Sequence, residues 1–144
     1  MRTYYLILLF IVNLACSSKQ LDPYDLYGNW QIMKSHQSPL LYQEIFIDSK
    51  HLYVYDENVG YNPKNKFFIK NDSLFTSTLG AGFKNLGKVS LKNEKVTFSL
   101  KNKESEVSYR RIDDSNVLQD LISEKITQQV FSESFFKRMR NFKK

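Results

Sequence analysis

Eight short runs in which apolar and polar residues alternate constrain the fold of this chain more than any other feature. Turn-forming residues separate the runs at close intervals. Alternation with a period of two is typical of strands, and several short strands at close spacing indicate an all-β sandwich or barrel. The expected strands are 30–34, 43–47, 52–56, 66–70, 74–78, 87–91, 96–100 and 106–112.

Most of the expected connections are tight turns. Asn71-Asp72 joins two runs directly, because both residues tolerate the left-handed conformation that a two-residue hairpin needs. Only the connections 57–65 and 79–86 are longer. Short links make neighbours in sequence neighbours in space, and eight strands in such a meander close into a barrel without exposed edges. We therefore predict an eight-stranded antiparallel up-and-down barrel over residues 27–113.

After residue 113 the pattern changes to that of an amphipathic helix. Apolar residues from Leu118 to Phe142 recur at helical spacing, which predicts a helix over about 116–140 within a C-terminal segment 114–144. Ser115 or Asn116 is the expected N-cap, and basic residues gather at the C-terminal end, which favours cations. Two roles stay open for this helix. Its apolar stripe packs on the outside of the barrel, or its last turns contact a membrane surface or a partner.

The first residues of the chain predict where the protein is located. The apolar run over residues 4–12 is shorter than the roughly 20 residues needed to cross a bilayer, and it is typical of the core of a secretory signal. Ala15 and Cys16 follow it. This arrangement resembles the lipobox of bacterial lipoproteins, in which the signal is cut before a cysteine that then carries acyl chains such as palmitate. The resemblance implies a signal peptide over 1–15, a lipidated Cys16 and a tether over 16–26.

Cys16 has two other interpretations. In the first, Cys16 is an ordinary buried thiol. In the second, the apolar run over residues 4–12 is an uncleaved N-terminal anchor. Against the first, Cys16 stands at the end of the apolar run and before a polar Ser17-Ser18-Lys19 stretch. Against the second, the small Ala15 suits the pocket of a signal peptidase. Ser17 in place of an aspartate resembles outer-membrane sorting, so the expected location is the cell envelope, on the outer membrane facing the periplasm.

Length, cysteine content and charge narrow the class of protein further. The 144 residues suit one domain with an ordinary core. A single cysteine excludes a disulfide framework, so the stability has to come from packing. The formal net charge is +6. In an exported protein this charge favours contact with anionic lipid or surface glycolipid, and no nucleic-acid partner is expected.

A second resemblance appears at the two ends of the expected barrel. Gly28-Asn29-Trp30 opens the first strand and Tyr109-Arg110-Arg111 closes the last one. Together with the number of strands and the lipobox, these residues resemble the lipocalin-like domains of bacterial lipoproteins. The resemblance implies that Gly28 lets the chain cross beneath the barrel and that Trp30 plugs its narrow end. It also implies that Arg111 packs over Trp30, a contact worth about 0.5–2 kcal/mol.

What the barrel holds is left open by this pattern. An eight-stranded barrel has an interior that side chains just fill or that holds one small ligand. Tyr53, Tyr55, Phe67 and Phe98 either line an open mouth, as an apolar cup with hydroxyl groups, or form the core. The leading hypothesis is an envelope lipoprotein that binds a small apolar ligand. The alternative is a filled barrel that contacts another envelope protein, as an inhibitor or immunity-type module.

Patterns that would indicate an enzyme or a metal site were not found. His36 and His51 are isolated from other ligand residues, and Gly80-Ala81-Gly82 lacks the lysine and hydroxyl residue of a phosphate loop. No Gly-x-Ser-x-Gly motif is present. The paired carboxylates at 56–57 and 113–114 lie at strand ends, where such residues are usually solvated. We therefore expect a binding protein without cofactor, metal or catalytic residues.

Overall fold

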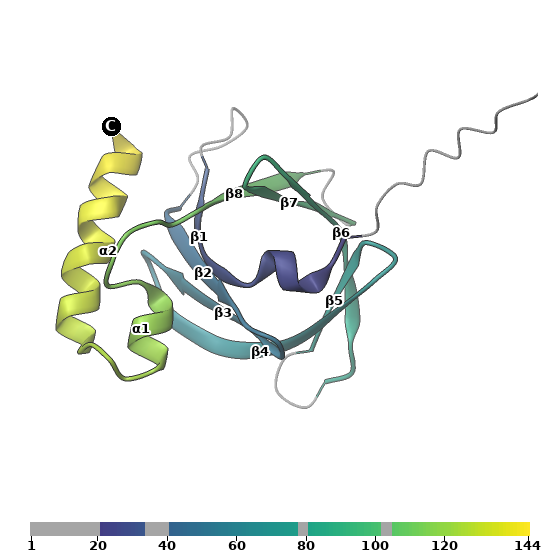
Figure 1. The fold of residues 1–144 in the computed structure, drawn as a ribbon, viewed down its shortest axis with the longest axis horizontal. Coiled ribbons are helices and arrows are strands. Elements are labelled where there is room, and N and C mark those ends of the chain that lie inside the picture. Colours follow the sequence, from purple (N-terminus) through teal and green to yellow (C-terminus); the bar gives the residue numbers. More distant parts are fainter. Residues whose placement is uncertain (1–20, 34–40, 78–80, 102–104) are drawn as a thin grey trace, which may run out of the picture.

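A computed structural model of the chain describes residues 21–33, 41–77, 81–101 and 105–144. Eight antiparallel strands, each paired with the next in sequence, form a closed barrel because β8 also pairs with β1 (Figure 1). The strands are β1 (Gly28–Ile32), β2 (Gln43–Ile47), β3 (His51–Asp56), β4 (Gly60–Lys70), β5 (Ser73–Ser77), β6 (Lys84–Lys92), β7 (Lys95–Leu100) and β8 (Glu106–Arg111). A 3-10 helix, η1 (Pro23–Leu26), precedes β1, and the helices α1 (Leu118–Ile122) and α2 (Gln128–Lys143) follow β8. The predicted barrel is confirmed, whereas Cys16 and the leader lie outside the described residues.

Each predicted strand overlaps an observed one, but β4 begins at Gly60 and not at Lys66. Much of the predicted loop 57–65 is therefore strand. The turn before β4 is tight because Asp56 Oδ1 accepts hydrogen bonds from the backbone N–H groups of Asn58 (2.9 Å) and Val59 (2.7 Å). Such an aspartate-centred turn replaces the longer loop that the glycine and proline suggested.

Pro63 is tolerated within β4 because the pairing of β4 with β3 is irregular there. The register between these strands shifts between Leu52 and Val54, which pair with Asn65 and Asn62 respectively. The irregularity lies opposite Pro63, whose nitrogen has no hydrogen to donate to the ladder. A proline inside this run is therefore compatible with a strand.

The prediction of one continuous helix over 116–140 is wrong, because the chain forms two helices. After α1, Glu124 adopts a left-handed conformation with φ 58°. Its N–H donates to Leu121 O (3.1 Å), and the N–H of Lys125 donates to Asp120 O (2.9 Å). These two bonds are those of a Schellman helix end, a position usually taken by glycine. Among the described residues, no helix is long and apolar enough to span a bilayer.

One end of the barrel, the closed end, is plugged by Trp30 and crossed by η1 (Figure 1). The indole is fully buried, and its N–H donates to Leu26 O (2.8 Å). The guanidinium carbon of Arg111 lies 4.2 Å from the centroid of the Trp30 ring. Arg111 also donates to Tyr27 O (2.9 Å) and Asp25 O (3.1 Å). Arg111 therefore ties the segment before β1 to β8, in the contact that the lipocalin-like resemblance implies.

Gly28 occupies a position that only glycine fits at this closed end. Its φ is +129°, and a Cβ added there would lie 2.5 Å from Arg111 Nη1. Backbone strain at this φ rises steeply for a residue with a side chain. Gly28 therefore allows the turn from η1 into β1 and leaves room for Arg111 over Trp30.

The helix α2 packs on the outside of the barrel against β3 and the start of β2. Phe131 and Phe135 are buried, and their ring centroids each lie 4.8 Å from that of Tyr55. Phe135 also lies 5.0 Å from Tyr42. Of the two roles predicted for the apolar stripe, packing on the barrel is confirmed.

A buried ion pair lies under α2. Glu44 is 0% exposed, and its carboxylate accepts from Arg138 Nε (2.8 Å) and Nη2 (3.1 Å). Tyr42 Oη donates to the same carboxylate (2.7 Å), and burial followed by the charge of Glu44 raises the pKa of Tyr42. Burial is the largest single effect on Arg138 and opposes its charge, but the hydrogen bonds and charges of Glu44 and Tyr42 together outweigh burial and raise the pKa of Arg138. This pair joins α2 to the barrel at one defined position.

Replacing Arg138 with methionine is expected to lower the free energy of unfolding by about 3–5 kcal/mol, because Glu44 is left buried and unpaired. The double variant Glu44→Leu/Arg138→Met should recover most of this loss. The measurement is urea denaturation followed by circular dichroism. Arg140→Met is the matched control, since Arg140 is an exposed arginine of the same helix. Equal losses in the two single variants would contradict a structural role for the pair.

Gly28→Ala is expected to lower the free energy of unfolding by about 1–3 kcal/mol, because alanine is strained at this backbone conformation. The matched control is Gly82→Ala, since no atom lies within 4 Å of a Cβ at Gly82. Thermal unfolding of the two variants and the parent protein gives the comparison. If Gly28→Ala is as stable as Gly82→Ala, the glycine is not required at this turn.

Candidate functional site

The other end of the barrel, the open end, contains a cavity of about 690 Å³. Every strand contributes to its wall, because alternate residues of a strand point to the same side. The lining residues are Ile32, Leu41, Gln43, Ile45, Leu52, Val54, Asn65, Leu74, Thr76, Leu86, Phe98, Leu100, Val107 and Tyr109. This volume lies within the roughly 300–1,000 Å³ typical of sites for small molecules.

The cavity ends at a floor formed by large side chains. Leu52, Leu74 and Phe98 line both the cavity and a remnant of about 10 Å³ below it. The remnant is otherwise lined by Leu26, Ile47 and Phe67. A space of this size is at the limit of what one water molecule needs. The barrel is therefore filled towards its closed end and hollow towards its open end, where Leu41 (49% exposed) and Leu86 (39% exposed) form part of the rim.

The polar groups of the cavity are few and uncharged. They belong to Gln43, Asn65, Thr76 and Tyr109. Tyr109 Oη donates to Gln43 Oε1, and burial raises the pKa of Tyr109, so its hydroxyl keeps its proton at neutral pH. No charged side chain is among the described lining residues. Because an unpaired charge is costly to bury, such a cavity suits a neutral and mostly apolar molecule with one or two hydrogen-bonding groups.

The four aromatic residues predicted to line an open mouth do not lie together. Phe98 lines the cavity, and Phe67 lies in the filled part below it. Tyr53 and Tyr55 face outwards, so the prediction is wrong for both. Tyr55 packs against α2 and its hydroxyl accepts from Gln128 Nε2 (3.2 Å).

The reason for this error is the side of the strand that faces inwards. In the run 52–55, the aliphatic Leu52 and Val54 line the cavity, and the two tyrosines take the outer face. Tyr53 stacks on Phe46 (centroids 5.6 Å apart) and donates its hydroxyl to Asp48 Oδ2 (3.2 Å). A period of two shows which residues share a face but not which face is inside.

Sequence reasoning also missed the polar residues of the cavity. Gln43, Asn65 and Thr76 are polar residues of strands, and the sequence pattern predicts that such residues face solvent. In the sequence, Tyr109 belongs to the closing Tyr109-Arg110-Arg111 pattern, which does not indicate that its hydroxyl lies in the cavity wall. The pairing of Ile32 with Tyr109 across β1 and β8 brings it to the cavity wall. No local signal in the sequence shows this, because the pairing depends on closure of the ring.

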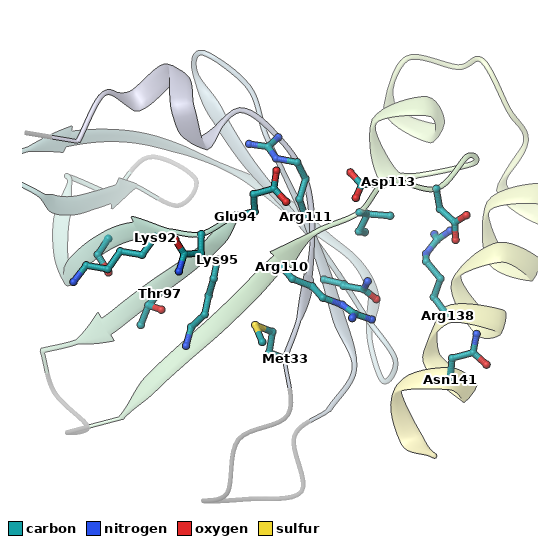
Figure 2. A pocket seen from close by; sticks show the side chains of 15 residues that line it. Met33, Lys92, Glu94, Lys95, Thr97, Arg110, Arg111, Asp113, Arg138 and Asn141 are labelled. Atoms are coloured by element: carbon teal, nitrogen blue, oxygen red, sulfur yellow. The ribbon is translucent and has the colours of Figure 1, made fainter. Parts of the chain in front are cut away.

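A second hollow, of about 810 Å³, lies on the outer surface of the molecule. Figure 2 shows Arg138 and Asn141 of α2 on one side of it, Lys92 and Lys95 on the other, and Arg110 between them. Its charged lining residues are Lys92, Glu94, Lys95, Arg110, Arg111, Asp113, Asp114 and Arg138. Charges of both signs on an open surface suit a solvated or protein-contacting groove. The cavity inside the barrel is mostly apolar and has no charged residue among its described lining residues, so it is the stronger candidate for a site that binds a neutral small molecule.

Within the part of the chain that the structure describes, no group of three or more His, Cys, Asp and Glu side chains is placed to hold a metal ion. His51 lies beside Asp48, with Nδ1 3.8 Å from Oδ1, and its ring centroid is 5.8 Å from that of Tyr53. His36 lies outside the described residues. Comparisons with protein-family models, curated proteins and solved structures found no match. The resemblance to lipocalin-like domains therefore stays a prediction.

Proposed function

We propose that this protein is a lipoprotein of the cell envelope whose barrel carries a small, neutral and mostly apolar molecule. The observation that carries the proposal is the mostly apolar cavity of about 690 Å³ at the open end of the barrel, above a filled floor. A barrel whose function is only to present its surface has no need of a hollow of this size. Unfilled apolar space lowers stability by about 24 cal/mol per Å³ of cavity when it is created by mutation.

The chemistry of the wall supports a carrier and not an enzyme. General acid–base catalysis needs a titratable group within hydrogen-bond reach of the reacting atoms. Among the described lining residues the only titratable side chain is Tyr109, which is bonded to Gln43 and has a raised pKa. Gln43, Asn65 and Thr76 can orient a ligand by hydrogen bonds, and the surrounding aliphatic residues supply the burial.

The anchor in this proposal rests on the sequence. The apolar run over residues 4–12, followed by Ala15-Cys16, supports export and acylation of Cys16. Attachment of more than one acyl chain gives stable anchoring, since a single chain binds only marginally. The expected place is the outer membrane, with the barrel in the periplasm.

A protein-contacting role is the second candidate function, and the charged groove between α2 and the barrel favours it. Lys92 pairs across the strands with Lys95, and Lys95 pairs with Arg110, so three cations stand in one row. Like charges directly opposite each other are unfavourable without an anionic partner. An envelope protein with an acidic segment is a partner of suitable charge for this row.

The carrier proposal predicts that the double variant Val54→Trp/Val107→Trp, which fills the cavity, weakens binding of the neutral dye N-phenyl-1-naphthylamine at least about tenfold, or 1.4 kcal/mol. The readout is a fluorescence titration, with unfolding curves to confirm that the barrel is intact. Val59→Trp/Val130→Trp is the matched control, since these valines are 71% and 38% exposed. Native mass spectrometry of protein from its own host shows the natural ligand. Equal dye binding in the two double variants would place the ligand outside the cavity and defeat the proposal.

The anchor is tested by growing cells with radiolabelled palmitate. The wild-type chain should incorporate the label and fractionate with membranes, because the acyl chains are attached to the thiol of Cys16. Cys16→Ser should lose both the label and the membrane fractionation. The double variant Cys16→Ser/Ser17→Cys, in which the thiol stands one position later, is a control for the position of the thiol. Equal labelling of wild type and Cys16→Ser would refute acylation at this residue.

A further inference from the structure

The net charge of the molecule is concentrated on one side of the barrel. Residues 60–92, which form β4, β5 and β6, contain six lysines and one aspartate, whereas the rest of the chain has 15 basic and 14 acidic residues. All six lysines are exposed, and none forms an ion pair with a described carboxylate. In the ring of eight strands β6 stands opposite β2, the strand covered by α2 (Figure 1). The positive side is therefore opposite the side on which α2 packs.

Three phenylalanines form an exposed aromatic cluster on this same side. Phe68 and Phe75 pair across β4 and β5, with centroids 4.8 Å apart and planes at 6°. Phe83 lies edge-on to Phe68 at 4.9 Å. Their neighbours Leu74 and Thr76 line the cavity, so Phe75 and its partner Phe68 face outwards. Phe68 is 40% exposed and Phe83 is 49% exposed.

The lysines stand around this aromatic cluster. Lys66 and Lys70 flank Phe68 on the outer face of β4, because residues two apart share a face. Lys88 pairs with Ser73 beside Phe75, and its Nζ donates to Asn71 O (2.7 Å). A membrane-contacting surface has two features. Aromatic side chains enter the headgroup region, and cations around them attract anionic lipids.

The path of the chain before the barrel leads to this side. The backbone N–H of Leu21 donates to Asp72 Oδ1 (3.1 Å), in the turn between β4 and β5. Cys16 stands five positions before Leu21 in the sequence. Five extended residues span at most about 18 Å. An acyl group on Cys16 therefore holds the β4–β5 turn close to the bilayer.

We propose that the surface formed by Lys66, Phe68, Lys70, Phe75, Phe83 and Lys88, the β4–β6 face, lies on an anionic lipid bilayer. The inference deepens the proposed function and rests on its anchor at Cys16. The phenylalanines enter the interface, and the lysines bind lipid phosphates. The helix α2, on the opposite side, faces away from the membrane.

The test compares two tryptophan positions in protein that is expressed in its host with its leader, so that Cys16 can be processed and acylated. The protein is then purified from the host membranes and reconstituted into vesicles. The vesicles contain equal parts of phosphatidylglycerol and phosphatidylcholine with brominated acyl chains, which quench nearby indoles. Phe68→Trp reports the β4–β6 face. Phe136→Trp is the matched control, since Phe136 is 45% exposed on α2, and the native Trp30 is fully buried and common to both. We expect quenching several-fold stronger at position 68.

Charge variants test the role of the lysines. Lys66→Gln/Lys70→Gln should reduce the quenching of Phe68→Trp, and raising the salt concentration should have the same effect, because the attraction to anionic lipid is screened. Lys125→Gln/Lys137→Gln, which removes two exposed lysines near the other side, should leave it unchanged. Equal quenching at the two positions, or unchanged quenching in vesicles without phosphatidylglycerol, overturns the proposal. So does a dimer, seen by light scattering, that Phe68→Ser dissociates.

The proposal of the β4–β6 face and the proposal of the anchor at Cys16 can be refuted separately. Palmitate labelling of the same preparation reports the anchor, whereas the ratio of quenching at positions 68 and 136 reports the face. Selective quenching at position 68 in a chain without label refutes the anchor and keeps the face. A labelled chain with equal quenching refutes the face and keeps the anchor.

Discussion

Closure of the strand ring by pairing of β1 with β8 is the constraint on which the rest of the structure depends. Trp30 pairs with Arg111 and Ile32 with Tyr109 in this last pair of strands. The first of these pairs places the guanidinium over the indole and closes one end, and the second places a hydroxyl in the cavity wall. An eight-stranded barrel is wide enough either to be filled or to hold one ligand. Here the two outcomes occupy opposite ends of the same barrel.

The number and order of the strands, and the pairing of each strand with the next, could be predicted from local chemistry. The turn at Asn71-Asp72 has φ values of 50° and 54°, the left-handed conformation that its residue types suggested. The break between α1 and α2 could not be predicted in this way, because Glu124 adopts φ 58° without being glycine or asparagine. Its conformation is fixed by the two backbone hydrogen bonds that end α1. Local propensity therefore failed where backbone geometry and packing outweighed it.

The candidate site was predicted less well than the fold, for a related reason. A strand pattern assigns residues to two faces, and tertiary structure decides which face is inside. The burial of Glu44 could not be predicted from the strand pattern either. Glu44 stands beside Ile45 in β2, and its buried carboxylate is stabilised by Arg138, which comes from α2. The sequence leaves open whether Tyr53 and Tyr55 line an open mouth, as an apolar cup with hydroxyl groups, or form the core. Their burial on the outer surface follows from packing against Phe46 and α2.

The two sides of the barrel differ in whether a described helix covers their outward-facing aromatic residues, and under the membrane contact that we propose this difference bears on access to the cavity. On β3, Tyr55 is covered by Phe131 and Phe135 of α2. On β4 and β5, none of the described helices covers Phe68 and Phe75, and the lysines around them form no ion pair with a described carboxylate. Phe83 precedes β6, and Leu86 of β6 lines the cavity at its rim. With the β4–β6 face on a bilayer, the rim at Leu86 lies beside the lipid, so an apolar molecule can pass between membrane and cavity with little exposure to water.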